Sequence, residues 1–176
     1  MKISMTDIVI DHFNTLRDEN KKINNFDVFI FFVVPIIFGV IINLLHIRFD
    51  KDFYNTSITF FGIFIALLLN IQVAIFGIFT RKWSKNSDEN IIVEYKFEIR
   101  NKLINEVDCN ISYLVFICII SLVYFILVYS ILTQTKMSNR ILYSDISAFI
   151  YSHFLLNLLM VTKRSHALFS EEYKND

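Results

Sequence analysis

Four polar side chains lie inside long apolar stretches of the sequence, where lipid would offer them no hydrogen-bond partner: Asn70, Gln72, His153 and Asn157. His153 and Asn157 are four residues apart and share one face of a helix. Asn70 and Gln72 are two residues apart and point about 200° away from each other. Such groups form hydrogen bonds between helices, line a path for ions or water, or bind a small molecule.

Catalytic and metal-binding patterns are not found in the sequence. A proton relay would rest on His153 alone, because no Asp, Glu, Lys or Arg lies at the centre of an apolar stretch. There is no Gly-rich phosphate loop, no HExxH and no GxSxG. Cys109 and Cys118 lack ligand spacing, so we expect free thiols. The remaining histidines are isolated and are expected at the surface or at a membrane interface: His12, His46 and His166. We therefore predict a protein without enzyme activity, cofactor or metal.

The elements that position these groups are four apolar segments. The chain is 55% hydrophobic with a mean hydropathy of +0.49, and the excess is concentrated in residues 28–47, 58–79, 111–132 and 143–162. About 20 apolar residues in a helix cross the hydrocarbon core of a bilayer. The predicted fold is all-α, a membrane domain of four transmembrane helices over residues 28–162. Pro35 falls within the first span and should free one backbone carbonyl there.

Polar segments flank and separate the spans. Residues 1–27 are predicted to form an amphipathic helix followed by a linker, with Val9, Phe13 and Leu16 on one helix face. The segment 80–110 is predicted to be helical and to run unbroken into the third span, because no Gly or Pro intervenes between Asn90 and Thr133. Residues 163–176 are expected to form a mixed-charge tail.

The positions of Lys and Arg predict the orientation in the membrane. The N-terminal segment, the 80–110 segment and the tail hold 13 of the 17 basic residues, and the two short connections hold four. The positive-inside rule then places both termini in the cytosol of a multi-pass inner-membrane protein. Anchors to lipid headgroups are expected at Arg81, Lys82, Trp83, Lys163 and Arg164. Direct nucleic-acid binding is not expected, because the net charge is zero and acidic residues are interleaved.

The cytosolic segments expose apolar stripes, and one of them consists of Ile92, Tyr95, Ile99 and Leu103. These stripes either pack on each other, on the bilayer or on the bundle end, or they dock a soluble protein. Small residues four apart, such as Gly62 and Ala66, allow close helix approach and a homo-oligomer. Asn70 and Gln72 are expected to specify how the second span meets the fourth span and its neighbours.

Two stretches carry a resemblance to a known family. They are FDVFIFFVVPIIFGV at Phe26 to Val40 and FFGIFIALLLNIQ at Phe60 to Gln72. With this four-span plan, the chain resembles KwaA, the small membrane subunit of the Kiwa anti-phage defence system. The resemblance implies a tetrameric membrane protein that senses phage attack at the inner membrane and binds a cytosolic effector of the KwaB type. It transfers no functional residue.

Three functions are therefore compatible with the sequence. The first is a non-enzymatic inner-membrane subunit of an antiviral defence complex that docks a soluble effector. The second is an oligomeric channel-like effector that depolarises the membrane. The third is an immunity protein that blocks a bacteriocin within the membrane.

Overall fold

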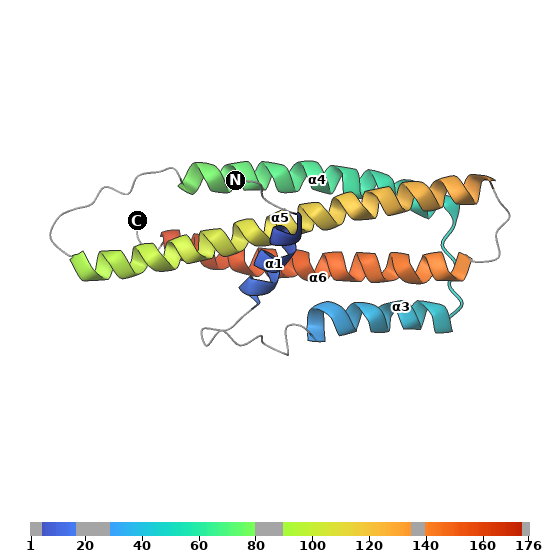
Figure 1. The fold of residues 1–176 in the computed structure, drawn as a ribbon, viewed down its shortest axis with the longest axis horizontal. Helices are drawn as coiled ribbons and strands as arrows, with labels where there is room; N and C mark the ends of the chain where they lie inside the picture. The colour runs from blue at the N-terminus through green and yellow to red at the C-terminus, as the bar shows by residue number, and fades with distance from the viewer. Residues whose placement is uncertain (1–4, 17–28, 80–89, 135–139, 174–176) are drawn as a thin grey trace.

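The computed structural model describes residues 5–16, 29–79, 90–134 and 140–173, and every regular element in these ranges is helical. This confirms the all-α prediction. The elements are α1 (Met5–Thr15), the π-helical turn η1 (Phe29–Val33), α3 (Val34–Leu44), α4 (Lys51–Phe79), α5 (Asn90–Gln134) and α6 (Arg140–Tyr173). The long helices lie side by side in the order α4, α5, α6, α3, and α1 crosses α5 near the middle of the molecule (Figure 1).

Three helices, α4, α5 and α6, are long and apolar enough to cross a membrane. The first predicted span is shorter in the structure than the sequence pattern indicates. It consists of 5 residues in η1 and 11 in α3, and it ends at Leu44 rather than at residue 47. Its length is about 24 Å, less than the roughly 30 Å of a hydrocarbon core. The element expected to be the first full span is therefore a short apolar helix, and α1 lies next to its N-terminal end (Figure 1).

The second predicted span begins earlier than expected. α4 starts at Lys51, whereas the sequence pattern predicted a connection over residues 48–55 and a span that starts at Ile58. The backbone N–H of Phe53 donates to Asp50 Oδ1 at 2.9 Å, so Asp50 is the N-cap of α4. The polar first turns are therefore helical as well, and Lys51 Nζ lies 5.0 Å from the centre of the Tyr129 ring.

The C-terminal end of α3 forms a Schellman motif. His46 adopts a left-handed conformation with φ of 53°, and its N–H donates to the carbonyl of Asn43. The N–H of Ile47 donates to the carbonyl of Ile42. Both bonds satisfy carbonyls that the helix end would leave without donors. At this end, which we call the connection end, Asn43 Nδ2 also donates to Asp145 Oδ2 on α6 at 2.5 Å.

α5 is continuous from Asn90 to Gln134, so the described part of the 80–110 segment runs into the third predicted span without a break. α6 continues to Tyr173, through most of the segment expected to be a tail. No Gly or Pro interrupts either helix. Both helices therefore extend beyond the apolar part of the chain, at the end of the molecule opposite the connection end.

The core lies mainly between α4 and α5. Buried positions recur every three or four residues along α5, which is the spacing of a left-handed helix pair. The α4–α5 seam comprises Tyr54, Phe61, Leu68 and Ile75 from α4, and Ile104, Val107, Ile111, Leu114, Cys118, Phe125 and Val128 from α5. Aromatic rings extend this seam to α6. The ring of Phe61 lies 5.4 Å from that of Phe125 and 5.3 Å from that of Phe154.

Candidate functional site

Pro35 creates the first polar contact of the candidate site. Proline has no N–H, so the carbonyl four residues earlier, that of Phe31, lacks its α-helical donor. His153 Nδ1 on α6 donates to this carbonyl at 2.8 Å. The freed carbonyl that the sequence predicts is therefore satisfied by one of the polar residues found inside an apolar stretch.

The other ring nitrogen of His153 faces α5. Because Nδ1 carries the hydrogen given to Phe31, Nε2 of the neutral ring accepts, and the Tyr113 hydroxyl donates to it at 3.1 Å. Asn157 lies one helical turn further along α6, and its Nδ2 donates to the carbonyl of His153 at 2.8 Å. His153 and Asn157 share a buried helix face, as predicted.

His12 of α1 completes this layer, and its position corrects a prediction. The sequence placed it at the surface or an interface, but its side chain is 0% exposed. The imidazole stacks on the Tyr113 ring with centroids 3.7 Å apart, and Nδ1 donates to Asn110 Oδ1 at 2.7 Å. A single helix turn of α5, containing Asn110 and Tyr113, thus holds His12 by one hydrogen bond and one ring stack.

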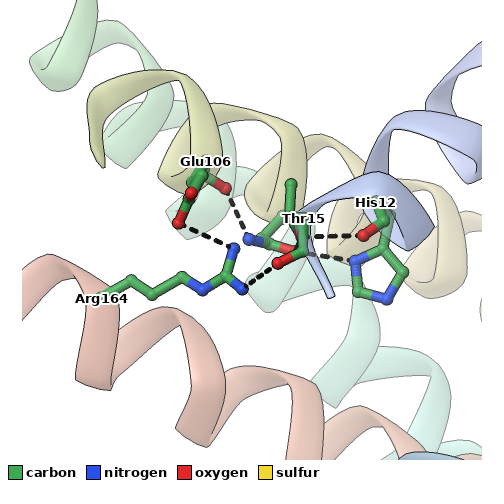
Figure 2. A network of polar contacts seen from close by, with 5 residues as sticks. His12, Thr15, Glu106 and Arg164 are labelled. Atoms are coloured by element: carbon green, nitrogen blue, oxygen red, sulfur yellow. Dashed lines mark hydrogen bonds and ion pairs between the residues drawn. The ribbon is translucent and has the colours of Figure 1, made fainter. Parts of the chain in front are cut away.

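An ion pair closes the site on the far side of α1. Arg164 Nη2 donates to the backbone carbonyl of Thr15 at 2.6 Å, and Nη1 lies 3.5 Å from Glu106 Oε2 (Figure 2). The Thr15 hydroxyl lies 2.7 Å from the His12 carbonyl and 3.1 Å from Asn110 Oδ1. Arg164 therefore links the last turn of α1 to both α5 and α6.

We call this set the polar junction, and it consists of His12, Thr15, Glu106, Asn110, Tyr113, His153, Asn157 and Arg164. Two of its buried acceptors have no partner within the described chain, His12 Nε2 and Asn157 Oδ1. Burial lowers the pKa of His12 to about 4, and the nearby His153 and Arg164 act in the same direction, against the hydrogen bond to Asn110. The imidazole of His12 is therefore neutral at pH 7.

The polar junction connects helices through hydrogen bonds, a ring stack and an ion pair. Among the described residues no group of His, Cys, Asp and Glu side chains is arranged to hold a metal ion. The two histidines are neutral and buried, and their donors are committed to Asn110 and Phe31. These contacts fix the positions of α1 and η1 against α5 and α6. They depend on the protonation state of the two histidines and on the docking of α1.

The two amides expected on the second span are separated as predicted, but they do not meet the fourth span. Gln72 Nε2 donates to Asp108 Oδ1 at 3.0 Å and to Ser112 Oγ at 2.9 Å, both on α5. Asn70 is exposed on the outer face of α4. The structure therefore places His153 and Asn157 together in the junction and leaves Asn70 and Gln72 outside it.

The predicted docking and anchor residues fall into three groups. Leu103 is half-buried and packs on the seam. The side chains of Ile92, Tyr95 and Ile99, and all of Arg81, Lys82 and Trp83, lie outside the described part of the structure. Lys163 is exposed, as an anchor must be, whereas the guanidinium of Arg164 turns inward to Glu106 and Thr15.

Several junction residues were not singled out from the sequence. His12 lies on the same helix face as Val9, Phe13 and Leu16, and this shared face was the available signal for its burial. Asn110 and Tyr113 have no such signal, because they lie at the border between polar and apolar sequence. In comparisons with protein-family models, curated proteins and solved structures, nothing matches the chain.

Proposed function

We propose that this protein is a non-enzymatic, four-span inner-membrane subunit of a bacterial antiviral defence complex, and that it docks a soluble effector on its cytosolic side. Both termini and the projecting end of α5 lie in the cytosol, in accordance with the distribution of Lys and Arg. The short η1–α3 helix and α1 together serve as the first span and its cytosolic cap.

The observation that carries the docking role is the length of α5. Its 45 residues correspond to about 68 Å, more than twice a hydrocarbon core. Its first turns project beyond the ends of α4 and α6 (Figure 1). A rigid helix that leaves the membrane and bears the predicted stripe of Ile92, Tyr95 and Ile99 offers a surface to a soluble protein.

The resemblance to the Kiwa membrane subunit supports a tetramer with a KwaB-like effector. Sensing requires two states with different contacts. The polar junction is a candidate for the part of the molecule that differs between these two states, because α1 is linked to the bundle by few side chains. Disturbance of the surrounding lipid by phage would release α1 and alter what the adjoining α5 end presents.

The experiment is a pull-down of the tagged protein from its own genomic context, in detergent. The variant Ile92→Ser/Tyr95→Ser/Ile99→Ser should lose the co-purified soluble partner and keep its oligomeric mass. The matched control, Glu94→Ala/Asn101→Ala, changes the opposite face of the same turns and should retain the partner. Equal recovery of the partner with both variants would refute the docking surface.

The exposed amide of Asn70 favours a second candidate, the oligomeric channel that depolarises the membrane. An amide on the outer face of a spanning helix has no water to bond with in lipid, so assembly around a pore would accommodate it. Under this alternative, Asn70→Leu abolishes the current across a planar bilayer. Under the docking role, Asn70→Leu leaves partner recovery unchanged.

A further inference from the structure

A groove of about 790 Å³ lies between α4 and α5, at the end of the seam nearer the junction. Its volume is in the range of binding sites for small molecules. The lining is mainly apolar, from Leu69, Val73, Ile75, Phe76 and Ile104. Val73 and Phe76 are 71% and 68% exposed, so their side chains form the open wall of this groove.

The polar part of the groove presents acceptors. Gln72 gives its Nε2 hydrogens to Asp108 Oδ1 and Ser112 Oγ. Gln72 Oε1 and the second oxygen of Asp108 remain, and both are acceptors without a partner among the described residues. The third polar lining residue, Asn105, is exposed.

Among the described residues, no cationic side chain pairs with Asp108. Glu106 lies two residues away on α5 and pairs with Arg164. Asp108 has only the Gln72 amide among the described side chains. Along α6, about 28 Å of helix separates Arg164 from Asp145, which is close to the thickness of a hydrocarbon core. Because Glu106 pairs with Arg164, the adjacent Asp108 lies near one edge of such a core. A carboxylate at such an edge is stabilised by a cation.

From this geometry we propose that the α4–α5 groove binds one phospholipid with a primary ammonium headgroup, of the phosphatidylethanolamine class. The ammonium donates to Asp108 and to Gln72 Oε1, and an acyl chain lies along Leu69 and Val73. An apolar body with a cationic donor matches an apolar groove that offers acceptors and a negative charge. The proposal requires only that α4 and α5 cross a bilayer, and it is independent of the defence role.

The test uses native mass spectrometry of the full-length protein, delipidated in detergent and titrated with single lipids of identical acyl chains. Phosphatidylethanolamine should bind about tenfold or more tightly than phosphatidylcholine, whose trimethylated ammonium has no N–H, and than phosphatidylglycerol, which has no cation. Asp108→Asn keeps the shape and the acceptor for Gln72, and it should remove this preference. The charge control is Asp11→Asn on α1, which should retain it.

A second variant, Val73→Trp, fills the groove without touching the carboxylate. It should reduce binding of the first lipid molecule, whereas Val123→Trp, on the exposed face of α5, should not. Equal binding of the three lipids by the unmodified protein overturns the proposal. A preference that survives Asp108→Asn also overturns it. If Val73→Trp changes the number of protomers per particle instead of lipid binding, the occupant is a second copy of the chain.

Discussion

The α4–α5 seam and the polar junction lie on the same helix, α5, and hold their neighbours by different interactions. The seam consists almost entirely of apolar and aromatic side chains in close contact. The junction holds α1 through His12, Thr15 and Arg164, and it leaves two buried acceptors without partners. In a bilayer the seam gains little from the hydrophobic effect, because lipid is equally apolar, so dispersion and shape stabilise it.

The two regions differ in local stability, and this difference predicts which of them opens first. Stability in the seam is spread over many contacts, whereas α1 depends on a few bonds. We therefore expect α1 to detach locally at a free energy well below that of global unfolding. The chain carries a native reporter in each region. Cys118 is buried in the seam, and Cys109 is half-buried beside α1, in a polar hollow lined by Asp11 and Thr15.

The largest expected effect is that of Phe61→Ala in the seam. Phe61 is 0% exposed and contacts rings on α5 and α6, so its truncation should cost about 3 kcal/mol and leave a cavity. Labelling of Cys118 by a thiol reagent should rise about 100-fold. The control, Phe76→Ala, removes an exposed ring of α4. A small effect of Phe61→Ala, equal to that of the control, would show that the seam is not the main source of stability.

The next effect concerns the attachment of α1. Arg164→Gln removes the ion pair to Glu106 and the charged donor to Thr15, and should cost about 1–2 kcal/mol. Labelling of Cys109 should rise about tenfold, with Cys118 unchanged. Lys163→Gln, at the exposed neighbouring position, should alter neither. Parallel increases at both cysteines would mean that α1 and the seam open as one unit.

A third effect is the pH dependence of α1 docking. The pKa of His12 is lowered by burial to about 4, against an ordinary value of 6.5, so protonation favours the released helix. Docking should be constant above pH 6.5 and weaken as the pH falls toward 4, by at most about tenfold per pH unit. The measurement is the Cys109 labelling rate relative to His12→Gln at each pH, with a pyridyl disulfide. His166→Gln should keep the rise, and a flat ratio would contradict the burial of His12.

The smallest effect is at the connection end, remote from both regions. His46→Gly relieves the left-handed conformation and should raise the unfolding temperature by about 2 °C, partly offset by loss of the bond from His46 Nδ1 to the Leu44 carbonyl. His46→Ala loses the same bond without the relief and should lower it. Neither substitution should change labelling of Cys109 or Cys118. The expected order of unfolding temperatures, from highest to lowest, is His46→Gly, the unmodified protein and His46→Ala.

Much of the helical architecture is predictable because its determinants are local. The absence of Gly and Pro predicts the continuous α5, and Pro35 predicts a freed carbonyl. The start of α4 was missed because Asp50 was treated as part of a charged connection and not as an N-cap. The seam was not predicted because lipid-facing residues such as Val123 are as apolar as the buried Phe125, which hides the helical period.

The sequence predicted only some residues of the junction, and the reason is a different one. His153 and Asn157 stand out because their surroundings are apolar, but their partners come from residues far away in the chain. The contact from His12 to Asn110 joins positions 98 residues apart, and that from Arg164 to Thr15 joins positions 149 apart. No local pattern encodes these pairs, since they depend on the row of helices and on the shortness of α3.

The contact between Arg164 and Thr15 also sets an order of events during synthesis. The last turn of α1 is made nearly 150 residues before the side chain that holds it. At about 5–20 residues per second, this interval is roughly 7–30 s. His12 gains its partners on α5, Asn110 and Tyr113, about 100 residues after its own synthesis, and Arg164 adds the contact from α6 about 50 residues later. A ribosome stalled between residues 113 and 164 would therefore display a nascent chain in which α5 alone holds α1.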